Sequence, residues 1–159
     1  MGARFQQEDV VASSFIEFNG KGFWDGDGAI RDLLALLLVE LDARGLRKKQ
    51  AELWEHWTLQ AYVFFTGAHD VGLELYAADA PTRTLILDCC EAVARKTGQV
   101  ERPRPRGFDQ AERELFEGAE RFIDLDVVRP LALQVARLLR GEVGASAEAP
   151  EAQHWREGR

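Results

Sequence analysis

The sequence predicts a mainly α, single-domain bundle of five or six helices, with a short strand or hairpin as a further element near the N-terminus. Two observations lead to this prediction. The chain has 159 residues, the length of one ordinary domain. Several segments carry apolar residues at helical spacing, and most connections between them are short, so consecutive helices should pack antiparallel. The helical domain is predicted to cover residues 1–141, and the small, polar and charged residues 142–159 are predicted to form a disordered tail.

The N-terminal region is predicted to contain little helix. Residues 10–18 indicate a short strand or an extended arm. Residues 19–28 include four glycines and are predicted to form a turn-rich loop, because glycine adopts left-handed backbone conformations readily. In that loop, Phe23 and Trp24 are expected to anchor the chain on the core.

The clearest helix is predicted over residues 29–44. Asp25 or Asp27 can cap its start, and Gly45 is well placed to end it. Its apolar side chains cover one face and spread beyond it, which indicates a central helix covered on most sides. These side chains are Ile30, Leu33, Leu34, Leu36, Leu37, Leu38, Val39 and Leu41.

A second helix begins near residue 47, and its later part is ambiguous. Leu53, Trp57 and Ala61 share a helical face, but apolar side chains also alternate from residue 59 to residue 65. Such alternation would suit a hairpin with residues 71–76. The helix is the preferred interpretation, with a break at Gly67 and a short helical turn near 70–77.

The third long helix is predicted between Asp79, which caps it, and Gly98, which ends it. Pro81 then lies in the first turn, where a proline is tolerated. Residues 99–107 contain three arginines and two prolines and are interpreted as a stiff, basic connector.

Two helices are predicted after this connector. Asp109 and Glu112 have the spacing of a capping box, and they would begin a helix over residues 110–123, with Phe122 on its inner face. The last helix is predicted over 127–140. Pro130 must then lie in its first turn, and Gly141 ends it.

Charge and hydropathy argue against a general nucleic-acid binder and against a membrane-spanning protein. The net charge is −7, whereas a general nucleic-acid binder needs a surplus of Lys and Arg. The longest apolar run, residues 33–39, is far shorter than the ~20 residues that cross a bilayer. Cys89 and Cys90 are adjacent and suit a reducing compartment. A cytoplasmic protein with neither nucleic acid nor membrane as a partner is therefore expected.

No catalytic residue, metal or cofactor is predicted. Glu52 and His56 are four residues apart, and His69 and Asp70 follow after the expected break, so these four side chains are the candidates for a metal site. The chain lacks the Glu-x-x-His spacing of di-iron bundles. Because only three histidines are present, local hydrogen bonding is the preferred role for His56 and His69.

Acidic side chains form two groups that could bind a basic protein. One lies around the glycine-rich stretch, and the other lies within residues 109–126, where seven acids accompany two bases. Acidic faces of this kind speed association with a basic protein by electrostatic steering. The predicted partner-binding residues are Asp25, Asp27, Asp32, Glu114, Glu117, Glu120 and Asp124.

Four short stretches carry a family resemblance: Gly-Phe-Trp-Asp-Gly-Asp-Gly at 22–28, Leu-Val-Glu-Leu-Asp at 38–42, Glu-His-Trp-Thr-Leu-Gln-Ala at 55–61 and Leu-Leu-Arg-Gly-Glu-Val at 138–143. Together they resemble a group of small, acidic, uncharacterised bacterial proteins. In size and acidity that group is similar to the immunity proteins of bacterial toxin systems. The resemblance implies a protein that neutralises a cognate, basic toxin by direct binding and occlusion. The alternatives are a small metal-dependent hydrolase and a self-associating structural or regulatory subunit.

Overall fold

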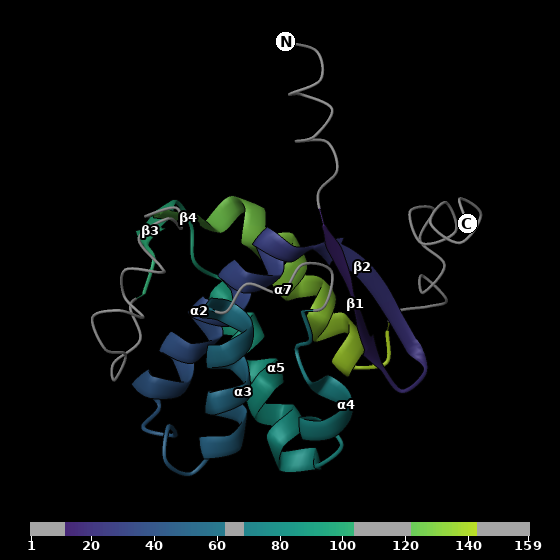
Figure 1. Cartoon of the computed structure of the whole chain (residues 1–159). Helices are drawn as coiled ribbons and strands as arrows, with labels where there is room; N and C mark the ends of the chain where they lie inside the picture. The colour runs from purple at the N-terminus through teal and green to yellow at the C-terminus, as the bar shows by residue number, and fades with distance from the viewer. Residues whose placement is uncertain (1–11, 63–68, 104–121, 143–159) are drawn as a thin grey trace, which may run out of the picture.

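The computed structural model describes residues 12–62, 69–103 and 122–142 (Figure 1). In these residues, 59% of the chain is helical and 17% lies in strands. The described part is therefore α+β, with five helices and two small antiparallel two-stranded sheets. The prediction of a helical bundle is wrong, because an expected loop, an expected connector and the end of an expected helix form strands.

The first sheet is a hairpin of β1 (Ser13–Phe18) and β2 (Lys21–Gly26). Phe18 pairs with Lys21, so only Asn19 and Gly20 connect the strands. Both residues have positive φ angles, 53° and 75°, as a type I′ turn requires. The predicted strand is confirmed over Ser13–Phe18, whereas the loop predicted for 19–28 is wrong because β2 occupies most of it.

Helix α2 (Asp27–Ala43) is the central helix, as predicted. Residues 33–38 are all buried, so other elements cover it on nearly every side. The predicted cap is wrong: Gly26 precedes the helix, and no side chain caps its first amides. Gly45 follows the helix end as expected, and its N–H donates to the carbonyl of Asp42 at 3.0 Å.

Helix α3 (Ala51–Tyr62) and the short helix α4 (Leu73–Tyr76) confirm the helical interpretation of this region. The alternative hairpin is wrong, because residues 59–62 and 73–76, which it would pair as strands, are helical. Leu53, Trp57 and Ala61 are buried along one face of α3, as their spacing predicts. The break expected at Gly67 lies outside the described residues.

Helix α5 (Ala80–Ala94) begins as predicted, since the Asp79 carboxylate accepts from the N–H of Thr82 at 3.1 Å. It ends four residues before Gly98. The chain then enters β3 (Gln99–Glu101), which pairs antiparallel with β4 (Phe122–Asp124). The interpretation of 99–107 as a connector is thus wrong over β3.

The predicted helix over 110–123 is wrong at its end, where β4 begins. Phe122 is exposed there, whereas a helix over 110–123 would place it on the inner face. The strand pairing explains the difference: the buried Ile123 of β4 lies opposite Val100 of β3, and Phe122 points outward. Residues 104–121, including the Asp109 cap, lie outside the described part of the chain.

Helix α7 (Leu125–Leu139) follows β4 directly. Asp124 caps it, because its carboxylate accepts from the N–H of Asp126 at 2.9 Å. The buried Ile123 before the cap and the buried Val128 in the helix have the spacing of a hydrophobic staple. Since α7 starts two residues before the predicted position, Pro130 lies in the second turn and not in the first.

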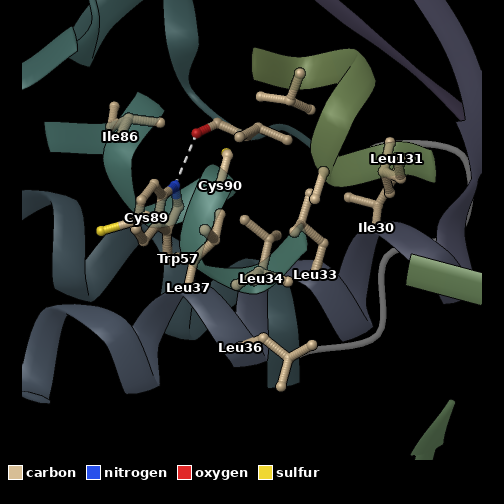
Figure 2. Close-up of a cluster of buried hydrophobic side chains, with 14 of the residues drawn as sticks. Ile30, Leu33, Leu34, Leu36, Leu37, Trp57, Ile86, Cys89, Cys90 and Leu131 are labelled. Atoms are coloured by element: carbon tan, nitrogen blue, oxygen red, sulfur yellow. Dashed lines mark hydrogen bonds between the residues drawn. The ribbon is translucent and has the colours of Figure 1, made fainter. Parts of the chain in front are cut away.

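The core surrounds α2, and Figure 2 shows Trp57 of α3, Ile86, Cys89 and Cys90 of α5 and Leu131 of α7 grouped about it. Both cysteines are fully buried free thiols. Burial raises the pKa of Cys89 to about 11 and raises the pKa of Cys90 as well. Among the described residues, no helix combines the length and apolar character needed to cross a membrane. The predicted tail is described only at Glu142.

Candidate functional site

Two of the predicted partner-binding acids, Asp27 and Asp32, instead bind other side chains of this protein. Asp27 is buried and accepts a hydrogen bond from the Ser14 hydroxyl at 2.5 Å. Asp32 forms a partly buried ion pair with Arg102, also at 2.5 Å. Both carboxylates therefore hold α2 against other elements of the fold.

The other predicted acids have different positions. Asp25 is half-buried, and its carboxylate accepts from the N–H of Gly26 at 2.7 Å. Asp124 is exposed at the start of α7, where it serves as the helix cap. Glu114, Glu117 and Glu120 lie outside the described residues. Of the predicted partner-binding acids that the structure describes, Asp124 is therefore the one that is exposed.

A different acidic surface forms where α3 meets α4. We call it the α3–α4 surface, and it consists of Glu52, Glu55, His56, Asp70, Glu74, Leu75 and Tyr76. Among the described residues, none of its four carboxylates takes part in an ion pair. Leu75 is 72% exposed, the largest value among the exposed large hydrophobic side chains of the described chain.

Tyr76 connects α4 to α3 on this surface. Its hydroxyl donates to the backbone carbonyl of Glu52 at 3.4 Å, and its ring centroid is 5.5 Å from that of His56. Partial burial raises the pKa of Tyr76, and the carboxylates of Glu52, Glu55 and Asp70 raise it further. The three acids are thus close enough to act on one side chain and give the surface a negative potential.

Hydrogen bonds from α3 hold the 69–72 segment, which leads into α4. The Nε2 of His56 donates to the carbonyl of Asp70 at 2.8 Å, and the Nε1 of Trp57 donates to the carbonyl of Val71 at 2.9 Å. The side-chain oxygen of Gln60 accepts from the N–H of Asp70 at 2.9 Å. His56 and Trp57 are adjacent on α3 and Gln60 lies one turn later, so α3 positions Asp70 and Val71.

Gly72 completes this arrangement. Its φ angle is +77°, and its N–H donates to the Asp70 carboxylate at 2.8 Å. A Cβ atom at this position would lie 2.9 Å from the Tyr76 ring and 3.0 Å from His56. Only glycine therefore allows both the left-handed turn and the close packing of His56 and Tyr76.

The four candidates for a metal site do not form a common site, and each has another role. His56 and Asp70 are joined through the Asp70 carbonyl, and Glu52 contacts Tyr76 through its own carbonyl. The N–H of His69 donates to the Ser14 hydroxyl at 2.9 Å. Among the described residues, no three His, Cys, Asp or Glu side chains are grouped so that they could hold a metal ion.

His69 belongs to a buried polar cluster with Ser14 and Asp27. It is 4% exposed, and its Nδ1 has no hydrogen-bond partner in the described structure. Burial lowers the pKa of His69. The Asp27 carboxylate opposes that shift, the Arg31 guanidinium adds to it, and a hydrogen bond to the backbone of Gln60 opposes it. The folded protein therefore holds His69 in the neutral form more strongly than the unfolded chain does.

This pKa shift predicts a loss of stability in acid. Because the pKa of His69 is below 6.5 in the folded state, the unfolded chain binds more protons as the pH falls below about 6.5, and the free energy of unfolding decreases. Above that pH, His69 contributes no pH dependence. Urea unfolding at a series of pH values should show this decrease, and His69→Gln should reduce it. The matched variant His56→Gln retains His69 and should keep the dependence; equal slopes for both variants would contradict the assignment.

Sequence reasoning missed the α3–α4 surface because its acids are spread over three segments. The available signal was the spacing of His56, Trp57 and Gln60, three side chains able to hydrogen-bond a neighbouring backbone from one side of a helix. No family model matches the chain, and no curated protein or solved structure matches it either. The geometry of the α3–α4 surface is therefore the basis for assigning a function.

Proposed function

We propose that the protein is a binding protein of the immunity type, which neutralises a cognate basic protein toxin by covering its functional surface. The observation that carries this proposal is the 72% exposure of Leu75 on α4, next in the chain to Tyr76, whose ring lies near carboxylates that form no ion pair among the described residues. An apolar side chain that a partner can enclose, surrounded by charged groups, is the usual anatomy of a protein–protein interface.

The charges of the α3–α4 surface indicate the chemistry of its partner. Glu52, Glu55, Asp70 and Glu74 carry one sign of charge, and a complementary surface must supply Lys or Arg. Toxins that act on nucleic acids or other anionic substrates need such cations for their own substrate. Occupying those cations with carboxylates would block the substrate directly, and the opposite potentials would speed the encounter.

The 69–72 segment makes the surface suitable for rigid recognition. Hydrogen bonds from α3 fix the position of Asp70, and packing on His56 fixes the position of Tyr76. A surface that is ordered before binding loses less conformational entropy in the complex. Leu75 and Tyr76 are therefore the expected anchors, and the acids are expected to determine the association rate.

Two variants of the α3–α4 surface test the proposal. Partners captured by the full chain are first identified, and their affinity is then measured with purified proteins. Leu75→Ser should weaken binding by about tenfold or more, as truncation of an interface anchor does. The double variant Glu55→Lys/Glu74→Lys should mainly slow association and reduce its dependence on salt. Asp70 is left unchanged, because its carboxylate also holds Gly72.

A matched control changes the same number of charges elsewhere. Asp42→Lys/Asp88→Lys alters two exposed acids on α2 and α5 and should leave the affinity unchanged. The captured partner should also arrest growth when it is expressed alone, and co-expression of this protein should restore growth. A partner that binds the Leu75→Ser variant and the wild type equally would exclude the α3–α4 surface, and a partner without toxicity would exclude the immunity role.

A further inference from the structure

The outward face of α7 carries four exposed residues in line. We call Asp126, Pro130, Leu133 and Arg137 the α7 stripe. Their spacing is four, three and four residues, and alternation of four and three is the pattern of a helix–helix seam. Leu133 is 45% exposed, and Val127 beside the stripe is 57% exposed, so this face presents apolar surface that the described part of the chain leaves open.

The α7 stripe is complementary to itself. Its midpoint lies between residues 131 and 132, so reversal of its direction exchanges Asp126 with Arg137 and Pro130 with Leu133. An interface with two-fold symmetry requires this property, because the same residues must serve on both sides. A second α7 lying antiparallel on the first would place each aspartate opposite an arginine and each proline opposite a leucine.

The two charged residues are available for such pairing. The Asp126 side chain is 67% exposed, and it contacts Arg129 of its own helix at 3.2 Å. The guanidinium of Arg129 also donates to the carbonyl of Lys96 at 3.0 Å, which holds that side chain against its own copy. Among the described residues, Arg137 takes part in no ion pair, although it is exposed.

We infer that two copies of this chain associate antiparallel through the α7 stripe. Leu133 and Pro130 form the apolar centre, Val127 extends it, and the two Asp126–Arg137 pairs fix the direction of the helices. One helix per copy is a small interface, below the roughly 1,200 Å² of total buried area typical of stable complexes, so the association depends on protein concentration. The inference is independent of the proposed function, because the stripe shares no residue with the α3–α4 surface and a monomer carries that surface equally.

Single charge reversals on the full chain test the antiparallel arrangement. In Asp126→Lys each pair becomes Lys opposite Arg, and in Arg137→Glu each pair becomes Asp opposite Glu. Sedimentation equilibrium should show dimers of the wild type at high concentration and at least about tenfold weaker association for each variant alone. An equimolar mixture of the two variants makes both pairs attractive again and should associate as the wild type does.

Two further variants keep the test decisive. Asp126→Lys also removes the contact with Arg129 and a favourable charge from the helix start, so its thermal unfolding is measured first. If it does not fold, Leu133→Glu, which changes only an exposed side chain, should abolish association. Asp88→Lys on α5 is the matched charge control and should dimerise normally. A wild type that stays monomeric at every concentration, or a mixture that associates no better than its components, would overturn the inference.

Discussion

Replacement of Leu37 by aspartate is expected to unfold the protein. Leu37 is fully buried at the middle of α2, within a run of six consecutive buried residues from 33 to 38. A carboxylate there has no described polar partner, and burying an isolated charge or neutralising it costs several kcal/mol in addition to the lost packing. The sum of the charge penalty and the lost packing is comparable with the roughly 5–15 kcal/mol by which a typical domain is stable. Circular dichroism should show loss of helix and no cooperative thermal transition.

Two further variants distinguish the cost of a buried charge at position 37 from the cost of a cavity there and from the effect of an exposed aspartate. Leu37→Ala leaves a cavity without introducing a charge and should lower the free energy of unfolding by about 2–5 kcal/mol while the protein remains folded. Leu75→Asp introduces the same carboxylate at a leucine that is 72% exposed and should change stability by less than about 0.5 kcal/mol. A cooperative, wild-type-like transition for Leu37→Asp would show that α2 is not the centre of the core.

Replacement of Trp57 by alanine is expected to lower the free energy of unfolding by about 3–5 kcal/mol, the range for a large buried aromatic side chain. Trp57 is fully buried, and its Nε1 donates to the carbonyl of Val71 (Figure 2). The substitution therefore removes core volume and also leaves a buried backbone acceptor without its donor. Urea unfolding followed by circular dichroism gives the difference in free energy directly.

Phenylalanine at position 57 isolates the hydrogen bond from the volume. Trp57→Phe keeps much of the ring and should cost about 1–3 kcal/mol for the unpaired Val71 carbonyl and the residual cavity. The matched variant Trp54→Phe changes a half-buried tryptophan whose ring packs against Arg47, and it should cost less. Because Val71 belongs to the 69–72 segment, Trp57→Phe should also weaken partner binding. Equal stability losses for Trp54→Phe and Trp57→Phe would show that the Trp57 hydrogen bond contributes little.

The helices could be predicted because their signals are local. The spacing of apolar residues predicts α2. Gly45 indicates the end of α2, and Asp79 indicates the start of α5, with Pro81 in its first turn. The first hairpin was also encoded locally, by Asn19 and Gly20, but neighbouring glycines made the whole stretch resemble a loop. The second sheet had no such signal, because β3 and β4 have three residues each and the chain between them is long. Only tertiary packing selects that pairing.

Some residues of the candidate site could be singled out from the sequence, but neither the whole surface nor its chemistry could be predicted. Glu52, His56, His69 and Asp70 are the sequence candidates for a metal site, and the structure joins only His56 to Asp70 by a hydrogen bond and places His69 beside Ser14. Their role depends on Trp57 and Gln60 of α3, whose hydrogen bonds draw the 69–72 segment against the helix. Asp27 differs from its prediction in another way. It is predicted to bind a partner at the surface, but it is buried. Its burial results from the Ser14 hydroxyl, a partner in β1 that sequence spacing does not indicate.

The adjacent thiols of Cys89 and Cys90 allow the transient exposure of α5 to be measured by chemical labelling. An alkylating reagent reacts with a thiolate, and burial both excludes the reagent and raises the thiol pKa on this stretch of α5. Modification must therefore proceed through molecules that have transiently exposed the helix. The labelling rate at each cysteine then measures the population of those open forms in native buffer, without denaturant. Equal rates at both sites would indicate that α5 opens as one cooperative unit.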